Sequence, residues 1–231
     1  MMLPIPSAAP PRPHPLITAV NEKFVLLNSC NEFDVSLQYP QMGLENAPYR
    51  CFVRESVYRM LLRAQSALPA GVRLCVWDVW RPLALQQELY NLYAGQIVER
   101  FGLQNASPKE RLEAVAGFVS PPEKNPLHPP VHTTGGAVDV TLTDENGVPL
   151  DMGTGFDDFS AAARTDYFET EYNPAVQENR RLLYGVMTGA GFTNLPGEWW
   201  HYDYGDRFWA YYNRCPAMYG GVFTAAEMPV E

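Results

Sequence analysis

The sequence predicts a single α+β domain in which helices flank a central sheet that is antiparallel or mixed. Three segments carry this prediction. Apolar residues recur at helical spacing over 53–68, and Pro69 ends that amphipathic helix. A short β-branched and aromatic run, typical of a buried strand, follows at 73–80. Residues 136–142 alternate between the two faces of another strand.

The remaining elements of the N-terminal half follow from turn residues and apolar spacing. Residues 1–20 hold six prolines, so we expect an extended arm, either loosely ordered or laid on the domain surface. Weak alternation predicts a first strand within 23–35, and the turn-rich segment 38–50 predicts a loop. Pro82 suits the first turn of the next helix. Three leucines mark the inner face of that helix: Leu85, Leu89 and Leu92.

The C-terminal half begins with a short helix over about 108–119 and a proline-rich, irregular connection over 121–131. After the strand at 136–142 we expect a turn at 144–147 and an irregular segment over 149–172. A helix over about 174–190 then stops near Gly191, and an aromatic-rich strand follows at 198–205. Four residues of that helix should point inward: Leu182, Leu183, Val186 and Met187.

Domain organisation is simple, because the chain shows neither an internal repeat nor a linker that splits it. With 231 residues it is long enough for one sizeable domain. We therefore divide it into an N-terminal arm, 1–20, and one domain, 21–231. The four cysteines form no C-x-x-C pair, so we expect reduced thiols, although their even number leaves a disulfide open.

Charge and hydropathy exclude several classes of partner. The chain has 17 basic and 26 acidic residues, a formal net charge of −9, which opposes the phosphate contacts that nucleic-acid binding requires. It has no apolar run of the roughly 20 residues that span a bilayer. The N-terminus lacks the basic and continuous apolar regions of a secretory signal. We expect no nucleic-acid or membrane partner and a cytoplasmic protein, or a periplasmic one if a signal was removed; the oligomeric state is open.

The first chemical cluster joins His132 to Asp139 through a glycine-rich turn. Imidazole and carboxylate both suit zinc, and a hydrolytic zinc ion has three protein ligands and a water. A loop-borne His132 and a strand-borne Asp139 could supply two of them. The spacing alone also fits a structural histidine beside a turn aspartate.

The second cluster places Glu198 three residues before His201. A carboxylate beside a metal-activated water can take its proton and return it to a leaving amine. Residues three apart in a regular strand point to opposite faces, so convergence requires a bend or bulge between these two residues. We predict that irregularity. A glutamate at a rim and a histidine packed among aromatic rings would equally fit this segment.

Two further residues are candidates by position. Arg81 follows the strand at 73–80, and Pro82 keeps it extended, so its charge could face a developing oxyanion. A surface ion pair is the alternative. Asp151, in an acidic turn, could bind a substrate ammonium group or accept hydrogen bonds within its own loop.

Together these motifs resemble the zinc signature of the D-alanyl-D-alanine dipeptidases and of their carboxypeptidase and endopeptidase relatives. The signature reads H-x-x-G-x-A-x-D, then E-x-W-H. The dipeptidase branch is matched by VWDVWRP at 76–82, LDMGTGFDDF at 150–159 and GFTNLPGEWWHYDYG at 191–205. Order and spacing agree from about residue 23 to residue 212.

The resemblance implies an enzyme, a zinc metallopeptidase with one Zn²⁺ per chain. It implies the α+β fold of the zinc D,D-peptidases, with a central, mainly antiparallel sheet, and makes 21–231 the catalytic domain. The implied substrate is the small dipeptide D-alanyl-D-alanine of peptidoglycan precursors. The implied roles are as follows: zinc ligands His132, Asp139 and His201; catalytic base and acid Glu198; oxyanion stabiliser Arg81; binding of the substrate's amino end Asp151.

Two positions depart from the family pattern. Pro130 stands where relatives usually carry serine, and Thr134 stands where they often carry arginine or a similar polar residue. We expect both to line the cleft, so they leave open a cell-wall carboxypeptidase or endopeptidase on the same scaffold. A non-catalytic zinc-binding module is the third reading. The proline-rich arm has no counterpart in the pattern.

Overall fold

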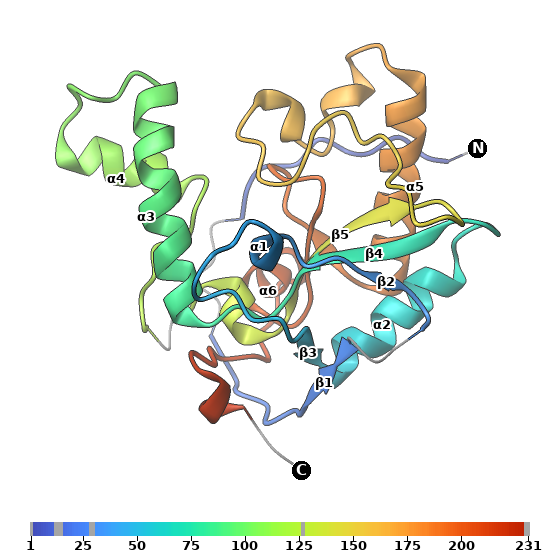
Figure 1. Cartoon of the computed structure of the whole chain (residues 1–231), viewed down its shortest axis with the longest axis horizontal. Coiled ribbons are helices and arrows are strands. Elements are labelled where there is room, and N and C mark those ends of the chain that lie inside the picture. Colours follow the sequence, from blue (N-terminus) through green and yellow to red (C-terminus); the bar gives the residue numbers. More distant parts are fainter. Residues whose placement is uncertain (1, 12–15, 28–30, 126–127, 229–231) are drawn as a thin grey trace.

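A five-stranded sheet lies at the centre of the protein (Figure 1). The computed structural model describes residues 2–11, 16–27, 31–125 and 128–228. The strand order is β2-β4-β5-β7-β6; β2 and β4 are parallel, and all other neighbours are antiparallel. These strands are β2 (Asp34–Val35), β4 (Arg73–Asp78), β5 (Ala137–Thr143), β6 (Thr193–Asn194) and β7 (His201–Asp203).

Two long helices, α2 (Glu55–Ser66) and α5 (Pro174–Ala190), pack against each other and against the sheet. Asn173 caps the start of α5, and Gly191 ends it with a φ of +112°. The apolar stripes of both helices lie in one buried core with alternate residues of β5. The stripes are Val57, Met60, Leu61 and Ala64 of α2, and Leu183, Val186, Met187 and Ala190 of α5.

The alternation predicted for 136–142 is confirmed in β5. Val138, Val140 and Leu142 belong to the core shared with α2 and α5. Asp139 points to the opposite face, as the two-residue period requires. All seven residues of β5 are nevertheless buried, because the opposite face is covered as well.

The cover over the opposite face includes a second apolar cluster built on α3 (Leu83–Arg100) and α4 (Pro108–Ala116). These helices stand together at one side of the sheet, in green in Figure 1. Ser107 and Glu110 form a reciprocal capping box at the start of α4. The second cluster consists of Tyr39, Ala47, Leu85, Leu89, Tyr93, Ile97, Val115 and Val119. The domain therefore has two cores, and the polar face of β5 lies between them.

The described parts of the N-terminal arm lie on the domain. Ile5 is buried. Ile17 forms a parallel bridge with Ala217, and the amides of Thr18 and Val20 donate to the carbonyl oxygens of Ala217 and Met218. Of the two arrangements expected for the arm, these contacts fit the one laid on the surface. The division of the chain at residue 20 stays a prediction.

Several predicted elements begin or end at residues other than those expected. The strand expected at 73–80 stops at Asp78, and that expected at 198–205 contains only β7. The loop expected at 38–50 includes a four-residue helix, α1 (Gln38–Gln41). A second, two-stranded sheet of β1 (Phe24–Leu26) and β3 (Phe52–Arg54) also takes the first residues expected in the 53–68 helix. Smaller elements are the 3₁₀ turns η2 (Val131–Thr134), η3 (Ala161–Ala163), η4 (Tyr167–Glu169) and η5 (Ala225–Glu227), and the helix α6 (Arg207–Asn213).

Among the described helices, none combines the length and apolar character needed to cross a membrane. Cys51 and Cys75 are buried and Cys215 is partly exposed, and no disulfide joins these three described cysteines. Cys30 lies outside the described residues.

The inner face of α3 differs from the prediction at one leucine. Leu85 and Leu89 are buried, whereas Leu92 is 38% exposed. We expect Leu89→Ala to lower the free energy of unfolding by about 2–5 kcal/mol, because it leaves a cavity in the second core. The matched change Leu92→Ala on the same helix should cost less than about 1 kcal/mol. Urea denaturation of both variants checks this; equal losses would contradict the two-core description.

Candidate active site

His132 sits on the 3₁₀ turn η2, directly before β5. The hydroxyl of Thr134 closes this turn: it donates to the carbonyl oxygen of Val131 at 2.6 Å and accepts from the amide of Gly136 at 3.0 Å. Gly135 has a φ of +74°, and a Cβ there would lie 2.4 Å from the ring of Phe24. Only glycine therefore allows the chain to leave the turn and enter β5 at this point.

Arg54, a buried arginine at the end of β3, is hydrogen-bonded to the turn that carries His132. Its Nε donates to the carbonyl oxygen of Thr134 at 2.9 Å, and its amide donates to the carbonyl oxygen of Gly135 at 3.1 Å. The guanidinium lies over the rings of Phe24 and Tyr219, at 4.3 and 5.1 Å from their centroids. Burial lowers the pKa of Arg54 to about 10, so the group remains a cation at neutral pH.

Sheet register brings the candidate metal ligands together. Asp139 of β5 stands directly opposite His201 of β7, and Nδ1 of His201 lies 3.0 Å from Oδ1 of Asp139. Nε2 of His132 lies 3.2 Å from Nδ1 of His201 and 3.5 Å from Oδ2 of Asp139. All three residues are buried, and their ligand atoms lie within 4.8 Å of one another.

The outer ring nitrogens of the two histidines have acceptor partners, which assigns their tautomers. Nδ1 of His132 donates to the carbonyl oxygen of Val79 at 2.8 Å. Nε2 of His201 donates to Oδ1 of Asp203 at 2.9 Å. In these neutral tautomers the inner nitrogens, Nε2 of His132 and Nδ1 of His201, present the lone pairs that a metal ion would bind; without a metal, Asp203 and Asp139 raise the pKa of His201 well above its usual value. Both inner nitrogens face the Asp139 carboxylate, and the hydrogen bonds of the outer nitrogens to Val79 and Asp203 fix the rings in that orientation.

This donor set fits a divalent metal ion. Two imidazole nitrogens and a carboxylate converge in a buried position, where the negative charge of Asp139 needs a cation beside it, either a protonated imidazole or a metal ion. The ligand types suit zinc, and three protein ligands leave a position for water. Burial alone would raise the pKa of Asp139, but His132 and His201 outweigh it and hold that pKa well below its usual range.

Asp203 is itself supported by a second buried carboxyl group. Oδ2 of Asp203 and Oδ2 of Asp206 lack a hydrogen-bond partner among the described residues, apart from each other. Burial and the charge of Asp203 raise the pKa of Asp206 well above its usual value. This shift favours a proton on Asp206 that bonds to Asp203, while Oδ1 of Asp206 accepts from the amides of Phe208 and Trp209 at the start of α6. The orientation of His201 is thus tied to α6.

Glu198 reaches the cluster because the chain turns before β7. Its amide donates to the carbonyl oxygen of Leu195, and the amide of His201 donates back to the carbonyl oxygen of Glu198. This turn confirms the irregularity predicted between Glu198 and His201. Oε2 of Glu198 lies 3.9 Å from Nδ1 of His201, and 27% of the side chain is exposed. Burial raises the pKa of Glu198 to about 8.

Arg81 is buried and not part of a surface ion pair. Its Nε and Nη2 donate to Oδ2 of Asp78 at 3.1 and 2.8 Å, Nη1 donates to Gln86 at 2.8 Å, and Nη2 donates to the hydroxyl of Tyr39 at 3.2 Å. A second carboxylate, Asp139, is 3.9 Å from Nη2. These four bonds leave one N–H of Nη1 for another acceptor, because a guanidinium has five. Burial would lower the pKa of Arg81, but Tyr39 and the two carboxylates raise it, so the charge is permanent.

A cavity of about 590 Å³ opens over these residues, between α3 and the polar face of the sheet. Its volume is in the range of small-ligand sites. Five of the six predicted site residues line it: Arg81, His132, Asp139, Glu198 and His201. The structure thus gathers a candidate metal centre, a carboxylate and a buried guanidinium in one water-accessible pocket.

Comparison with known proteins gives a family. The D-ala-D-ala dipeptidase family, one of the M15 peptidases, matches residues 42–218. A D-alanyl-D-alanine dipeptidase of Synechocystis sp. is 36% identical over 197 residues, which are 76% of this chain and 79% of that protein. The chain belongs to this family. A D-alanyl-D-alanine dipeptidase of Escherichia coli is 30% identical over 155 residues, 67% of each chain.

Family membership confirms the resemblance inferred from the motifs and makes the protein a metallopeptidase. A solved structure, the zinc complex of a vancomycin-resistance D,D-pentapeptidase VanY mutant, aligns with a TM-score of 0.42 and 16% identity. It covers 87% of this chain and 94% of that one, a likeness too distant to assign any residue.

Two residues predicted at the dipeptidase cleft are not brought to it. Asp151 is exposed and does not line the cavity; its Oδ1 accepts from the amide of Gly153 at 2.8 Å, which matches the self-bonded loop left open by the sequence. Thr134 is buried with its hydroxyl used inside the η2 turn. Pro130, the other departure from the family pattern, does line the cavity.

Sequence reasoning missed Asp157, which lies six residues after Asp151 and lines the cavity. Its Oδ2 accepts the hydroxyls of Tyr39 at 3.0 Å and Tyr93 at 2.7 Å. Burial raises its pKa to about 6. Asp157 has a φ of +53°, a conformation that non-glycine residues rarely adopt. No local pattern distinguishes it from the other aspartates of LDMGTGFDDF.

Arg180 of α5 fixes the loop that carries Asp157. It is 2% exposed and donates to three backbone carbonyl oxygens: those of Met152 at 2.8 Å, Ala162 at 2.8 Å and Arg164 at 2.6 Å. The guanidinium also lies 4.7 Å from the ring centroid of Phe168. One side chain thereby joins both ends of an otherwise irregular segment, which keeps the cavity wall in place.

The buried charge of Asp157 should lower stability at neutral pH. Its pKa rises on folding from 3.8 to about 6, so the folded state loses stability as pH rises across that interval, by up to about 3 kcal/mol. We expect Asp157→Asn, which tolerates the positive φ, to be more stable than the wild type above pH 6 and equal to it below about pH 4. Chemical denaturation of the metal-free proteins at both pH values checks this; a constant difference would contradict the assigned shift.

Proposed function

We propose that the protein is a zinc-dependent D-alanyl-D-alanine dipeptidase that hydrolyses its substrate with a metal-activated water and Glu198 as general base. The observation that carries the proposal is the convergence of His132, Asp139 and His201, with Glu198 beside them in a cavity. The names of the curated relatives supply the dipeptide as substrate.

His132, Asp139 and His201 would hold the zinc ion through Nε2, one carboxylate oxygen and Nδ1. Bound there, zinc would supply a Lewis acid and lower the pKa of a coordinated water toward about 7. The backbone carbonyl of Val79 and the carboxylate of Asp203 keep both histidines in the ligating tautomer.

Glu198 takes the proton of the attacking water and delivers it to the departing amine. Its position 3.9 Å from Nδ1 of His201, a proposed ligand nitrogen, supports this role. A raised pKa suits both halves of this role, because a group that titrates near the working pH can accept and then donate. The nearby cation would bring the pKa down from about 8 toward neutrality.

Arg81 stabilises the developing oxyanion with its remaining N–H. The guanidinium is held by Asp78, Gln86 and Tyr39, so it requires little reorganisation as charge develops. We assign Asp157 instead of Asp151 to the ammonium group of the dipeptide. Both tyrosine hydroxyls donate to Oδ2 of Asp157, which leaves Oδ1 for the substrate.

The decisive experiment incubates the zinc-loaded protein with D-alanyl-D-alanine and follows release of D-alanine. L-alanyl-L-alanine serves as the stereochemical control. We expect release from the D,D-dipeptide alone. Zinc bound without release would move the assignment to a different peptide, and a panel of D,D- and L,D-peptides would then test the carboxypeptidase and endopeptidase reading, for which Pro130 in the cavity is the specific observation.

Removing the general base should separate metal binding from turnover. We expect Glu198→Ala to retain stoichiometric zinc and to lose about 10²- to 10⁴-fold in kcat. Glu178→Ala, a change of an exposed glutamate on α5, is the control and should match the wild type. Metal analysis beside steady-state kinetics checks this. Near-normal turnover in Glu198→Ala would remove Glu198 from the mechanism.

Removing one ligand should abolish the metal site. We expect His132→Ala to purify without stoichiometric zinc, because two remaining ligands do not complete a catalytic zinc site. His128→Ala changes a histidine outside the cluster and should keep the full zinc content. Zinc retained in His132→Ala at the wild-type ratio would exclude His132 from the ligand set.

A further inference from the structure

The N-terminal arm forms part of the wall of the catalytic cavity. Pro10 and Pro11 line the same cavity as His132, Glu198 and Arg81. Both prolines precede the part of the chain that matches the dipeptidase family, which begins at residue 42. This wall is therefore a feature of this chain that the family match does not include.

Contacts at alternate residues hold the arm where it approaches the cavity. Ile5 is 5% exposed, and its amide donates to Oε1 of Glu169 at 3.1 Å. The side chain of Ser7 lies beside that of Asp166 and helps to lower the pKa of that carboxyl group. The carbonyl oxygen of Ala9 accepts the hydroxyl of Tyr212 at 3.0 Å. The segment is thus fastened to η4 and α6 immediately before Pro10.

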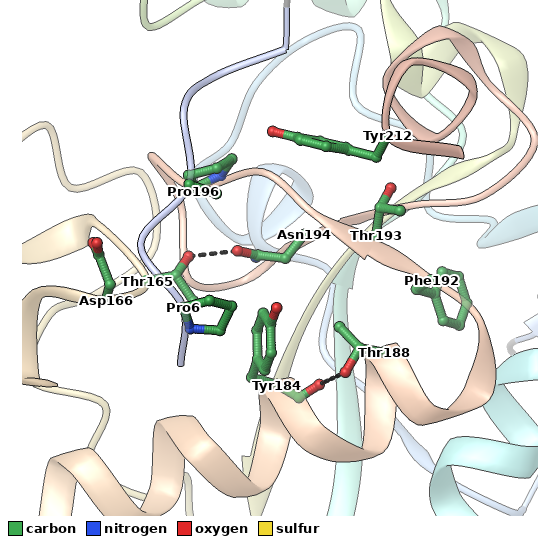
Figure 2. A pocket seen from close by; sticks show the side chains of 11 residues that line it. Pro6, Thr165, Asp166, Tyr184, Thr188, Phe192, Thr193, Asn194, Pro196 and Tyr212 are labelled. Carbon is green, nitrogen blue, oxygen red and sulfur yellow. Dashed lines mark hydrogen bonds between the residues drawn. The ribbon is translucent and has the colours of Figure 1, made fainter. Parts of the chain in front are cut away.

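The intervening arm residues line a second, smaller cavity of about 210 Å³ behind the loop that carries Glu198. Figure 2 shows Pro6 among Thr165, Tyr184 and Asn194 around this cavity. Pro196 lines both cavities, and its carbonyl oxygen accepts the amide of Thr165 at 3.1 Å. The arm therefore follows the outer side of the 195–198 loop from one cavity to the other.

The arm is fastened again beyond the catalytic cavity. The amides of Thr18 and Val20 donate to the carbonyl oxygens of Ala217 and Met218, each at 2.8 Å. Residues on both sides of Pro10 and Pro11 are thus bonded to the domain. The ring of each proline restricts its φ, which limits the backbone freedom of the arm where it lines the cavity.

From these contacts we infer that Pro10 and Pro11 are specificity-determining residues that restrict the catalytic cavity to dipeptides. The inference rests on the proposed dipeptidase function. A proline has no N–H, and its ring is apolar, so this wall donates no backbone hydrogen bond to a peptide that extends past the dipeptide. The additional peptide group of a longer substrate would lose its hydrogen bonds to water against the proline rings and gain none from them, which costs about 1–3 kcal/mol.

The test releases the arm and measures selectivity. Ile5→Ser removes the buried anchor, and Leu3→Ser makes the same change at an arm residue that is 84% exposed. The readout is the ratio of kcat/KM for D-alanyl-D-alanyl-D-alanine to that for D-alanyl-D-alanine. We expect Ile5→Ser to raise this ratio at least tenfold with dipeptide turnover retained, and Leu3→Ser to leave it unchanged.

A second variant addresses the wall without disturbing the anchor. The double change Pro10→Gly and Pro11→Gly removes both rings and introduces two backbone N–H groups. It should raise the ratio of kcat/KM for the tripeptide to that for the dipeptide. Slow hydrogen exchange at the amides of Thr18 and Val20 would verify that the domain and the second fastening remain folded.

The outcomes separate the two proposals. If the wild type hydrolyses the dipeptide and neither Ile5→Ser nor the double proline variant changes the ratio, the arm does not determine substrate length and this inference is overturned. An equal rise in Leu3→Ser would overturn it as well, since that residue lies outside the wall. A wild type with bound zinc but no dipeptide turnover would instead refute the proposed function.

Discussion

The register of β5 against its neighbours is the constraint on which the site depends. Asp139 lies opposite His201 of β7 and opposite Asp78 of β4, so one residue of the central strand links the candidate metal centre to the ion pair of Arg81. A slip of one residue would turn Asp139 into the core formed with α2 and α5. The apolar residues Val138 and Val140, which must face that core, therefore fix the position of the chemistry.

Buried carboxyl groups gather around the candidate metal centre. Asp78, Asp157, Glu198 and Asp206 all have pKa values raised by burial, although each lies near a partner that favours its charge or shares its proton. A structure optimised for stability alone would avoid such groups. Their clustering around the candidate metal centre is the pattern expected where ionisable groups are tuned for proton transfer and recognition.

The sequence was most informative where chemistry and periodicity coincide. The spacing of Glu198 and His201 predicted a break before the last strand. The turn is present, and β7 begins only after it, at His201. The long helices were predicted because their apolar stripes repeat. The ends of the short strands were not predicted, because they depend on hydrogen bonds between strands, which a local sequence pattern does not reveal. The β4 strand stops at Asp78, where its register against β5 shifts.

Residues whose role depends on tertiary position could not be ranked from sequence. Asp151 and Asp157 occupy one acidic turn, and only the placement of that turn by Arg180 brings the second aspartate to the cavity. Thr134 was expected at the cleft, but its hydroxyl is consumed by two backbone partners. Leu92 continues the three-residue apolar spacing from Leu89, but the buried stripe of α3 continues instead through Tyr93 and Ile97, so Leu92 lies beside the second core.

The outer strands of the central sheet have a consequence for self-association. Among the described residues, β2 and β6 each contain only two residues, and Asp34 at one edge is paired with Arg73. Edge strands template the addition of foreign strands when they offer a long, flat row of unpaired backbone groups. Here the longest strands, β4 and β5, are interior, and the two edge strands are too short to offer such a row, so the folded protein resists strand addition and amyloid-like stacking.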